Sequence, residues 1–140
     1  MKAYLTRRYW ISASHRLHNE AFSEAQNRET YGKCNNPFGH GHNYGIEVTV
    51  SGEVDHATGM VCNLVDLDAV VRQEIVERFD HEDLNTKTEF LNLVPTTENL
   101  AIVVFNILKP LLTFAHLEKI RIEETSNNSF EYAEEGPLRN

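Results

Sequence analysis

Residues 42–50 read HNYGIEVTV, and apolar and polar side chains alternate along most of this stretch. The apolar face consists of Tyr44, Ile46, Val48 and Val50. Glu47 and Thr49 lie on the opposite face. A period of two residues is typical of a β-strand with one buried and one exposed face. The stretch therefore predicts a strand in a sheet that is covered on one side.

Other segments of the chain show the same alternation or the turns that separate strands. Residues 3–17 place Tyr9, Ile11, Ala13, His15 and Leu17 on one face and predict an earlier strand. Further predictions are a short helix over 24–31, a turn at 55–59, a short strand over 60–64, strands over 117–125 and 129–132 around a turn, and a frayed tail over 133–140.

The period changes to about 3.6 residues in the middle of the chain, which predicts two amphipathic helices. In the first helix Asp66 is a suitable N-cap, and Leu67, Val71, Ile75 and Phe79 form an apolar stripe. The second helix begins near Pro95 and ends near Pro110. Its apolar positions are Leu100, Val103, Val104, Ile107, Leu108 and Leu111.

These elements predict an α+β fold in a single domain over residues 1–140, with an antiparallel sheet and two helices on one face. The main elements follow the order ββααββ. Two helices cover one face of such a sheet, so its other face and its edges stay open. We therefore expect the chain to self-associate.

Composition excludes several classes of protein. Lys and Arg number 13 against 21 Asp and Glu, a formal net charge of −8, so the chain lacks the basic surface that binds nucleic acids or anionic membranes. Its two cysteines exclude a disulfide scaffold and favour a reducing compartment. No stretch is apolar enough to span a membrane, and no signal peptide is recognisable at the start. We expect a cytoplasmic protein.

The histidines contain the strongest signal for a functional site. His40 and His42 are two residues apart at a strand start, so both imidazoles project to one face and can bind one metal ion. His15 ends the earlier strand on its inward face. Three neutral imidazoles suit a catalytic zinc ion, which keeps a position open for substrate. Incidental histidines in a Gly-rich loop are the alternative.

Cys34 lies six residues before His40 in a polar loop. It is interpreted as a reactive thiol, favoured as thiolate by Lys33 and a nearby cation. Two alternatives stay open: Cys34 is a fourth ligand of a structural zinc, or it is an inert loop thiol.

Other polar groups have weaker patterns. Asp80 and His81 could help a thiolate act as a base, but on local sequence alone a solvated acidic helix end over residues 80–83 is the better explanation. Glu124 lies at the end of a strand, and its carboxylate could accept two hydrogen bonds from adjacent donors of a heterocycle. Residues 96–98 (Thr-Thr-Glu) are explained by helix capping. Candidates for phosphate binding are Arg16, Arg28 and Lys33.

Taken together, these residues resemble one family, the 6-pyruvoyltetrahydropterin synthases. The resemblance runs in order along nearly the whole chain. The matching stretches are SASHRL (12–17), GKCNNP (32–37), GHGHNY (39–44), GEVD (52–55), TGMV (58–61), NL (63–64), Leu67, DH (80–81), LN (84–85), TTEN (96–99) and ETSNN (124–128). Phe38, where the family often has a smaller polar residue, and the loosely similar last strand depart from the pattern.

The resemblance implies a tunnelling fold, in which the sheets of a trimer join into a barrel and two trimers stack as a homohexamer with active sites between subunits. It also implies a zinc lyase that converts 7,8-dihydroneopterin triphosphate to 6-pyruvoyltetrahydropterin. Carried over by position, His15, His40 and His42 are the zinc ligands and Cys34 is the general base.

The remaining roles are also implied by the resemblance. Asp80 and His81 would form the proton relay of the base, and Glu124 would anchor the pterin ring. Thr96, Thr97 and Glu98 would line the pterin pocket.

Two alternative functions remain. The related 6-carboxytetrahydropterin synthases, which act in queuosine synthesis, tend to carry the cysteine nearer the His-x-His pair, so the spacing here favours the pyruvoyl branch. A non-catalytic binding module with a structural zinc would instead use Cys34 as the fourth ligand.

Overall fold

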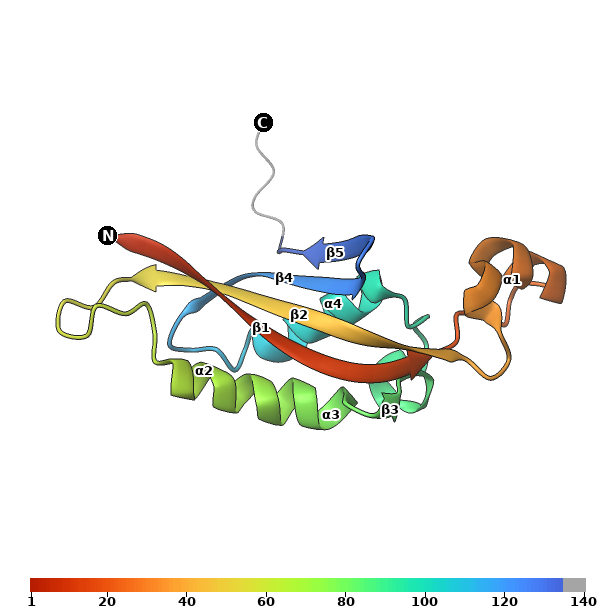
Figure 1. Ribbon diagram of the computed structural model, residues 1–140, viewed down its shortest axis with the longest axis horizontal. Coiled ribbons are helices and arrows are strands. Elements are labelled where there is room, and N and C mark those ends of the chain that lie inside the picture. The colour runs from red at the N-terminus through yellow and green to blue at the C-terminus, as the bar shows by residue number, and fades with distance from the viewer. Residues whose placement is uncertain (135–140) are drawn as a thin grey trace, which may run out of the picture.

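The computed structural model describes residues 1–134 of the chain as a long twisted sheet with helices on one of its faces (Figure 1). The tail predicted over 133–140 lies, from residue 135 on, outside the described residues. The strands are β1 (Lys2–His15), β2 (His40–Glu53), β3 (Glu82–Asp83), β4 (His116–Thr125) and β5 (Asn128–Tyr132), and the helices are α1 (Glu24–Tyr31), α2 (Leu64–Val71), α3 (Glu77–Phe79) and α4 (Thr97–Leu108).

The sheet has five strands in the order β3-β1-β2-β4-β5. Strands β1 and β2 pair antiparallel over their whole length, from Lys2 opposite Glu53 to His15 opposite His40. The pairs β2–β4 and β4–β5 are also antiparallel. The prediction of a purely antiparallel sheet is wrong, because β3 runs parallel to β1. With two residues, β3 is too short to produce a period in the sequence.

The helices cover one face of the sheet, as predicted. On that face Ile11, Tyr44, Ile46 and Ile122 are at most 2% exposed. The opposite face is open in the single chain, where Trp10 is 55% exposed. On this face the Trp10 ring lies across Gly45, where a Cβ would meet ring atoms at 3.0 Å.

The first long helix begins earlier than predicted. It starts at Leu64 with Asn63 as N-cap, whose side chain accepts from the amide of Val65. The predicted strand over 60–64 and the predicted N-cap Asp66 are therefore wrong. Asp66 lies instead in the first turn, where the helix dipole favours a carboxylate.

The predicted apolar stripe of this helix is confirmed, since Leu67, Val71, Ile75 and Phe79 are all 0% exposed. In a regular α-helix, side chains four residues apart differ by about 40° in direction around the helix axis, so a stripe with this spacing gradually turns away from the sheet. A π-helical segment over Arg72–Val76 joins α2 to α3, and its wider turn reduces this drift and keeps the stripe on the sheet.

Helix α4 also matches its prediction closely. Thr96 is its N-cap, and the helix ends one residue before Lys109-Pro110. None of the helices in residues 1–134 is long and apolar enough to cross a membrane.

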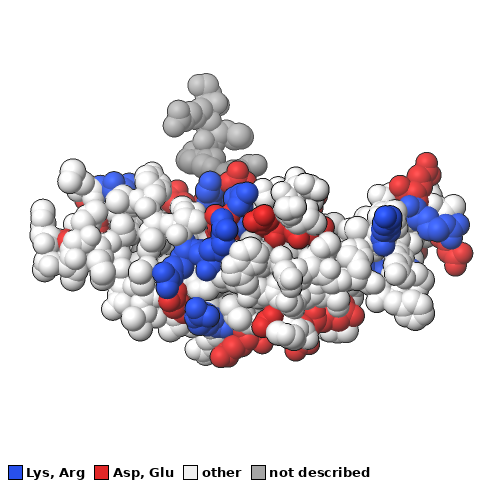
Figure 2. Space-filling model, viewed as in Figure 1, with Lys and Arg blue, Asp and Glu red and all other residues white. Residues whose placement is uncertain are grey.

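Helix α1 matches its predicted bounds and lies in a lobe beyond the end of the sheet (Figure 1). A capping box between Ser23 and Gln26 begins it. A 3₁₀ turn over Gly32–Asn35 follows and carries Cys34. Figure 2 shows basic and acidic side chains close together on this lobe.

One polar cluster joins the helical layer to the sheet. Asp68 of α2 accepts two hydrogen bonds of 2.9 Å from the Arg7 guanidinium and one of 2.6 Å from the Tyr9 hydroxyl. The hydrogen bonds from Arg7, and then that from Tyr9, lower the pKa of Asp68 from its ordinary value.

We predict that Asp68→Asn lowers the free energy of unfolding by about 1–2 kcal/mol, a modest figure because the Arg7 side chain is 40% exposed and solvent screens the pair. Chemical denaturation at fixed protein concentration measures the change. Since the folded-state pKa of Asp68 is lowered, the difference from wild type should be complete above about pH 4 and should vanish as pH falls through the folded pKa.

Asp66→Asn is the matched control, because Asp66 is exposed on the same helix. Equal losses for the two variants would contradict the role assigned to the Asp68 cluster.

Candidate metal and catalytic site

Three imidazoles lie together at one end of the sheet, where β1 ends and β2 begins. His15 is opposite His40 in the antiparallel register, and Ala13 is opposite His42. The ring centroids of His15 and His40, and of His40 and His42, are 4.8 Å apart, and those of His15 and His42 are 5.1 Å apart. The structure thus brings together all three histidines that were predicted from the sequence.

The loop before β2 passes close to the end of β1, and Gly39 makes this possible. Its φ is +70°, a region that side chains with a Cβ rarely adopt. A Cβ at Gly39 would also meet the carbonyl oxygen of His15 at 3.0 Å. The glycine therefore allows the chain to place His40 beside His15.

His15 is 1% exposed, and its ring is held in one orientation. Nδ1 lies 2.8 Å from the carbonyl oxygen of Pro95. Because a carbonyl only accepts, Nδ1 carries the proton and Nε2 has a free lone pair. Nε2 lies 3.2 Å from Nε2 of His40. Burial lowers the pKa of His15, which favours the neutral form that binds metals.

His42 has a buried nitrogen without a hydrogen bond. Among the described residues, its Nε2 is the one buried side-chain polar atom that lacks such a partner. Glu124 Oε1 lies 3.4 Å away, close enough for an ionic contact but without hydrogen-bond geometry. Burial lowers the pKa of His42. A buried, neutral nitrogen without a partner is costly unless something binds it.

The donor atoms form two overlapping groups that could each hold a metal ion. His15, Cys34 and His40 form one group, and His15, His42 and Glu124 form the other, with all donor atoms of a group within 4.8 Å of one another. Imidazole nitrogens with a thiol or carboxylate beside them suit zinc and other first-row transition metals. The residues present therefore fit a metal ion.

Cys34 is part of this cluster and is partly buried. The amide of Leu17 donates to its carbonyl oxygen at 2.8 Å, which fixes the 3₁₀ turn against the end of β1. Burial, and then the charge of Glu124, raise the pKa of the thiol. Lys33 is not among the groups that shift this pKa. A thiolate at Cys34 thus needs a cation nearby.

Glu124 lies near the end of β4 and belongs to the donor group with His15 and His42. Thr97, 2% exposed at the start of α4, donates a hydrogen bond from its hydroxyl to Glu124 Oε2. Of the three predicted pocket residues over 96–98, this is the one that contacts Glu124. Thr96 caps the helix, and Glu98 is exposed.

Asp80 and His81 lie together beside Ser12 of β1. Asp80 Oδ1 accepts from the amide of Ser12 at 2.8 Å, and Oδ2 lies 3.0 Å from His81 Nδ1. The hydrogen bond from Ser12 is the main cause that lowers the pKa of Asp80. The His81 side chain is 82% exposed. Within the described residues, neither side chain forms a hydrogen bond or ion pair with Cys34.

Sequence reasoning missed several groups around the site. The Tyr44 hydroxyl lies 3.2 Å from His15 Nδ1, and its ring packs edge-on against His42. Its position, two residues after His42 on the same strand face, was a usable signal. The Pro95 carbonyl and the Ser12 amide gave no signal in the sequence. They are backbone groups, and only the tertiary fold determines which of these groups lie at the site.

Comparison with known proteins gives consistent matches. The model of a family described as "6-pyruvoyl tetrahydropterin synthase" matches residues 4–135. The Homo sapiens protein named 6-pyruvoyl tetrahydrobiopterin synthase is 44% identical over 132 residues, which cover 94% of this chain and 91% of the human one. The Poecilia reticulata protein of the same name is 45% identical over 92% of this chain and 88% of its own.

A solved structure matches the fold as well. The Caenorhabditis elegans 6-pyruvoyl tetrahydropterin synthase superposes with a TM-score of 0.91 at 41% identity, covering 96% of this chain and 97% of that one.

Proposed function

The chain belongs to the 6-pyruvoyl tetrahydropterin synthase family, and we propose that His15, His40 and His42 hold the zinc ion of its active site. It is a lyase that converts 7,8-dihydroneopterin triphosphate to 6-pyruvoyltetrahydropterin and releases triphosphate. The observation that carries the metal assignment is the cluster of three buried or half-buried imidazoles, in which His42 Nε2 lacks a partner.

The three histidines differ in what fixes them. The Pro95 carbonyl sets the tautomer of His15, and a neighbouring group of this kind usually orients a metal-binding imidazole. His40 and His42 project from one face of β2, where the Tyr44 ring packs edge-on against His42. When bound, zinc supplies Lewis acidity that makes the carbon-bound hydrogens beside the side-chain oxygens of the substrate more acidic.

Cys34 is the proposed general base. Its Sγ lies within 4.8 Å of the metal-facing nitrogens of His15 and His40, so it can reach a hydrogen of a substrate held at the histidines. A positive charge there opposes the effects of burial and of Glu124, both of which keep the thiol protonated. The thiolate removes a proton, and the electron pair moves within the substrate.

Glu124 is proposed to anchor the pterin ring. Its carboxylate can accept two hydrogen bonds from adjacent ring N–H groups, while the Thr97 hydroxyl fixes its orientation. Thr96 and Glu98 would line the rim of the same pocket. Because the substrate supplies its own electrons, the reaction needs no redox cofactor.

Asp80 and His81 are proposed to serve Cys34 of a neighbouring subunit. The exposure of His81, and the lack of a hydrogen bond or ion pair from either residue to its own Cys34, fit a relay that acts across an interface. The open face of the sheet, with Trp10 exposed, fits an assembly of chains. We infer a homohexamer built as a dimer of trimers, whose joined sheets form a barrel.

A second function has one observation in its favour. Because Cys34 forms a donor group with His15 and His40, it could be the fourth ligand of a structural zinc in a non-catalytic module. The other alternative is a 6-carboxytetrahydropterin synthase, which differs from the proposed function in the product that it forms.

We expect Cys34→Ala to keep the metal and the assembly but to lower turnover of dihydroneopterin triphosphate by about 10²–10⁴-fold, the usual contribution of a general base. His42→Ala should lose both turnover and metal. Product mass measures turnover, metal analysis measures the zinc content, and light scattering measures the assembly. Cys62→Ala is the matched control, because Cys62 is the other free cysteine and is expected to leave turnover unchanged.

Unfolding with loss of zinc in Cys34→Ala would support the structural module instead. Formation of carboxytetrahydropterin with acetaldehyde by the wild-type protein would identify the alternative branch.

The relay across subunits predicts complementation. Cys34→Ala and His81→Ala should each be inactive alone, whereas an equal mixture, dissociated and reassembled, should regain about a quarter of wild-type activity from interfaces with both native residues. A mixture that stays inactive would contradict a site shared between subunits.

A further inference from the structure

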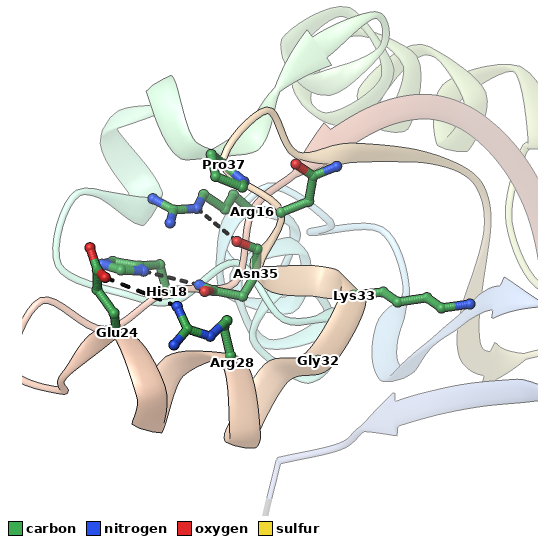
Figure 3. Close-up of a pocket in the computed structure, with 9 residues that line it drawn as sticks. Arg16, His18, Glu24, Arg28, Gly32, Lys33, Asn35 and Pro37 are labelled. Atoms are coloured by element: carbon green, nitrogen blue, oxygen red, sulfur yellow. Dashed lines mark hydrogen bonds and ion pairs between the residues drawn. The ribbon is translucent and has the colours of Figure 1, made fainter.

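A cavity of about 320 Å³ lies between α1 and the 3₁₀ turn that carries Cys34 (Figure 3). Its size is at the lower end of the range for small-ligand sites. Three basic side chains are among its lining residues, namely Arg16, Arg28 and Lys33, and Glu24 is the one acidic side chain. The chain as a whole has a net charge of −8, so this local excess of positive charge runs against its overall composition.

The cations of this cavity are poorly neutralised by the protein. Among the described Lys and Arg side chains, Arg16, Lys33 and Arg72 are the three without a carboxylate within 4.0 Å, and two of these three line the cavity. Arg28 has a single contact, at the limit of 4.0 Å, with a Glu24 side chain that is 92% exposed. Such exposed pairs contribute little, so Arg28 can bind another anion.

Hydrogen bonds orient further donors toward the cavity. Arg16 Nε donates to the carbonyl oxygen of Asn35 at 3.2 Å, which holds the guanidinium in place (Figure 3) and leaves its two terminal nitrogens without a hydrogen bond to the described residues. The buried Asn35 amide nitrogen lies 3.0 Å from His18 Nδ1 and donates to it, so His18 carries its proton on Nε2. The cavity therefore offers mostly donors and positive charge.

The cavity and the proposed active site share the same backbone. Arg16 directly follows His15, while Lys33 and Asn35 flank Cys34. The hydrogen bond from Leu17 to the Cys34 carbonyl ties the two segments together. A substrate held at the histidines therefore has this cavity beside the segment that carries the base.

We propose that this cavity binds the triphosphate of the substrate, with Arg16 and Arg28 as its main ligands and Lys33 at its rim. The proposal rests on the proposed function, which supplies a substrate with a triphosphate group. Arginine suits the role because its planar guanidinium binds phosphate oxygens in pairs. Figure 3 shows Lys33 directed away from the two arginines, which is why it is placed at the rim. Positive charge here also stabilises the triphosphate as it leaves.

The test uses inorganic tripolyphosphate as the probe of the zinc-loaded protein in calorimetry. Arg16→Gln and Arg28→Gln should each weaken its binding about tenfold or more, since each removes charged hydrogen bonds to the anion. Glu24→Gln should strengthen binding, because it removes the one negative charge of the cavity. Arg72→Gln is the matched control: it removes an equally unpaired cation that stacks on Tyr9 outside the cavity, and it should have no effect.

Kinetics with dihydroneopterin triphosphate separate this proposal from the proposed function. The kcat/KM of Arg16→Gln and Arg28→Gln should fall about tenfold, with a matching rise in the inhibition constant of tripolyphosphate. If wild type turns over and both variants behave like Arg72→Gln, the cavity proposal is overturned and the function stands. Specific tripolyphosphate binding without turnover would overturn the function and support the anion site.

Discussion

The hydrogen bond between buried His15 and the carbonyl of Pro95 is the interaction on which the site depends. It joins the end of β1 to the segment before α4 and turns Nε2 of His15 toward the other imidazoles. The register of β1 and β2 then brings His40 opposite His15. Without the fixed tautomer, Nε2 of His15, 3.2 Å from Nε2 of His40, would not present its lone pair to a cation at the histidines.

The electrostatics of the site follow from this arrangement. Burial favours neutral His15 and His42, and Glu124 supplies negative charge beside them and raises the pKa of Cys34. The neutral imidazoles and the Glu124 carboxylate favour a bound cation, and a cation in turn favours a thiolate at Cys34. Of the three described Lys and Arg side chains without a carboxylate partner, Arg16 and Lys33 line a separate cavity next to Cys34. The metal site proposed for the pterin side chain and the cavity proposed for its triphosphate thus adjoin each other.

The sequence predicted the parts of this molecule that a regular period encodes. The alternation of apolar and polar residues predicted β1 and β2, whose paired ends bring His15 together with His40 and His42. The apolar stripe from Leu67 to Phe79 is buried as expected. Strand β3 has two residues, and so no period could show it. The start of α2 was misplaced because Asn63 and Asp66 are both good caps, and only the fold selects between them. The contact of Pro95 with His15 joins residues 80 positions apart through a backbone oxygen, which leaves no mark in the sequence.

The central claim is that three imidazoles hold the metal while the Cys34 thiol stays free to act as a base. X-ray absorption at the zinc edge of the zinc-loaded protein tests it most directly. The account predicts a first shell of nitrogen and oxygen donors at about 2.0–2.1 Å, with an unchanged spectrum for Cys34→Ala. A sulfur donor at about 2.3 Å that disappears in Cys34→Ala would contradict the account and identify the zinc as structural.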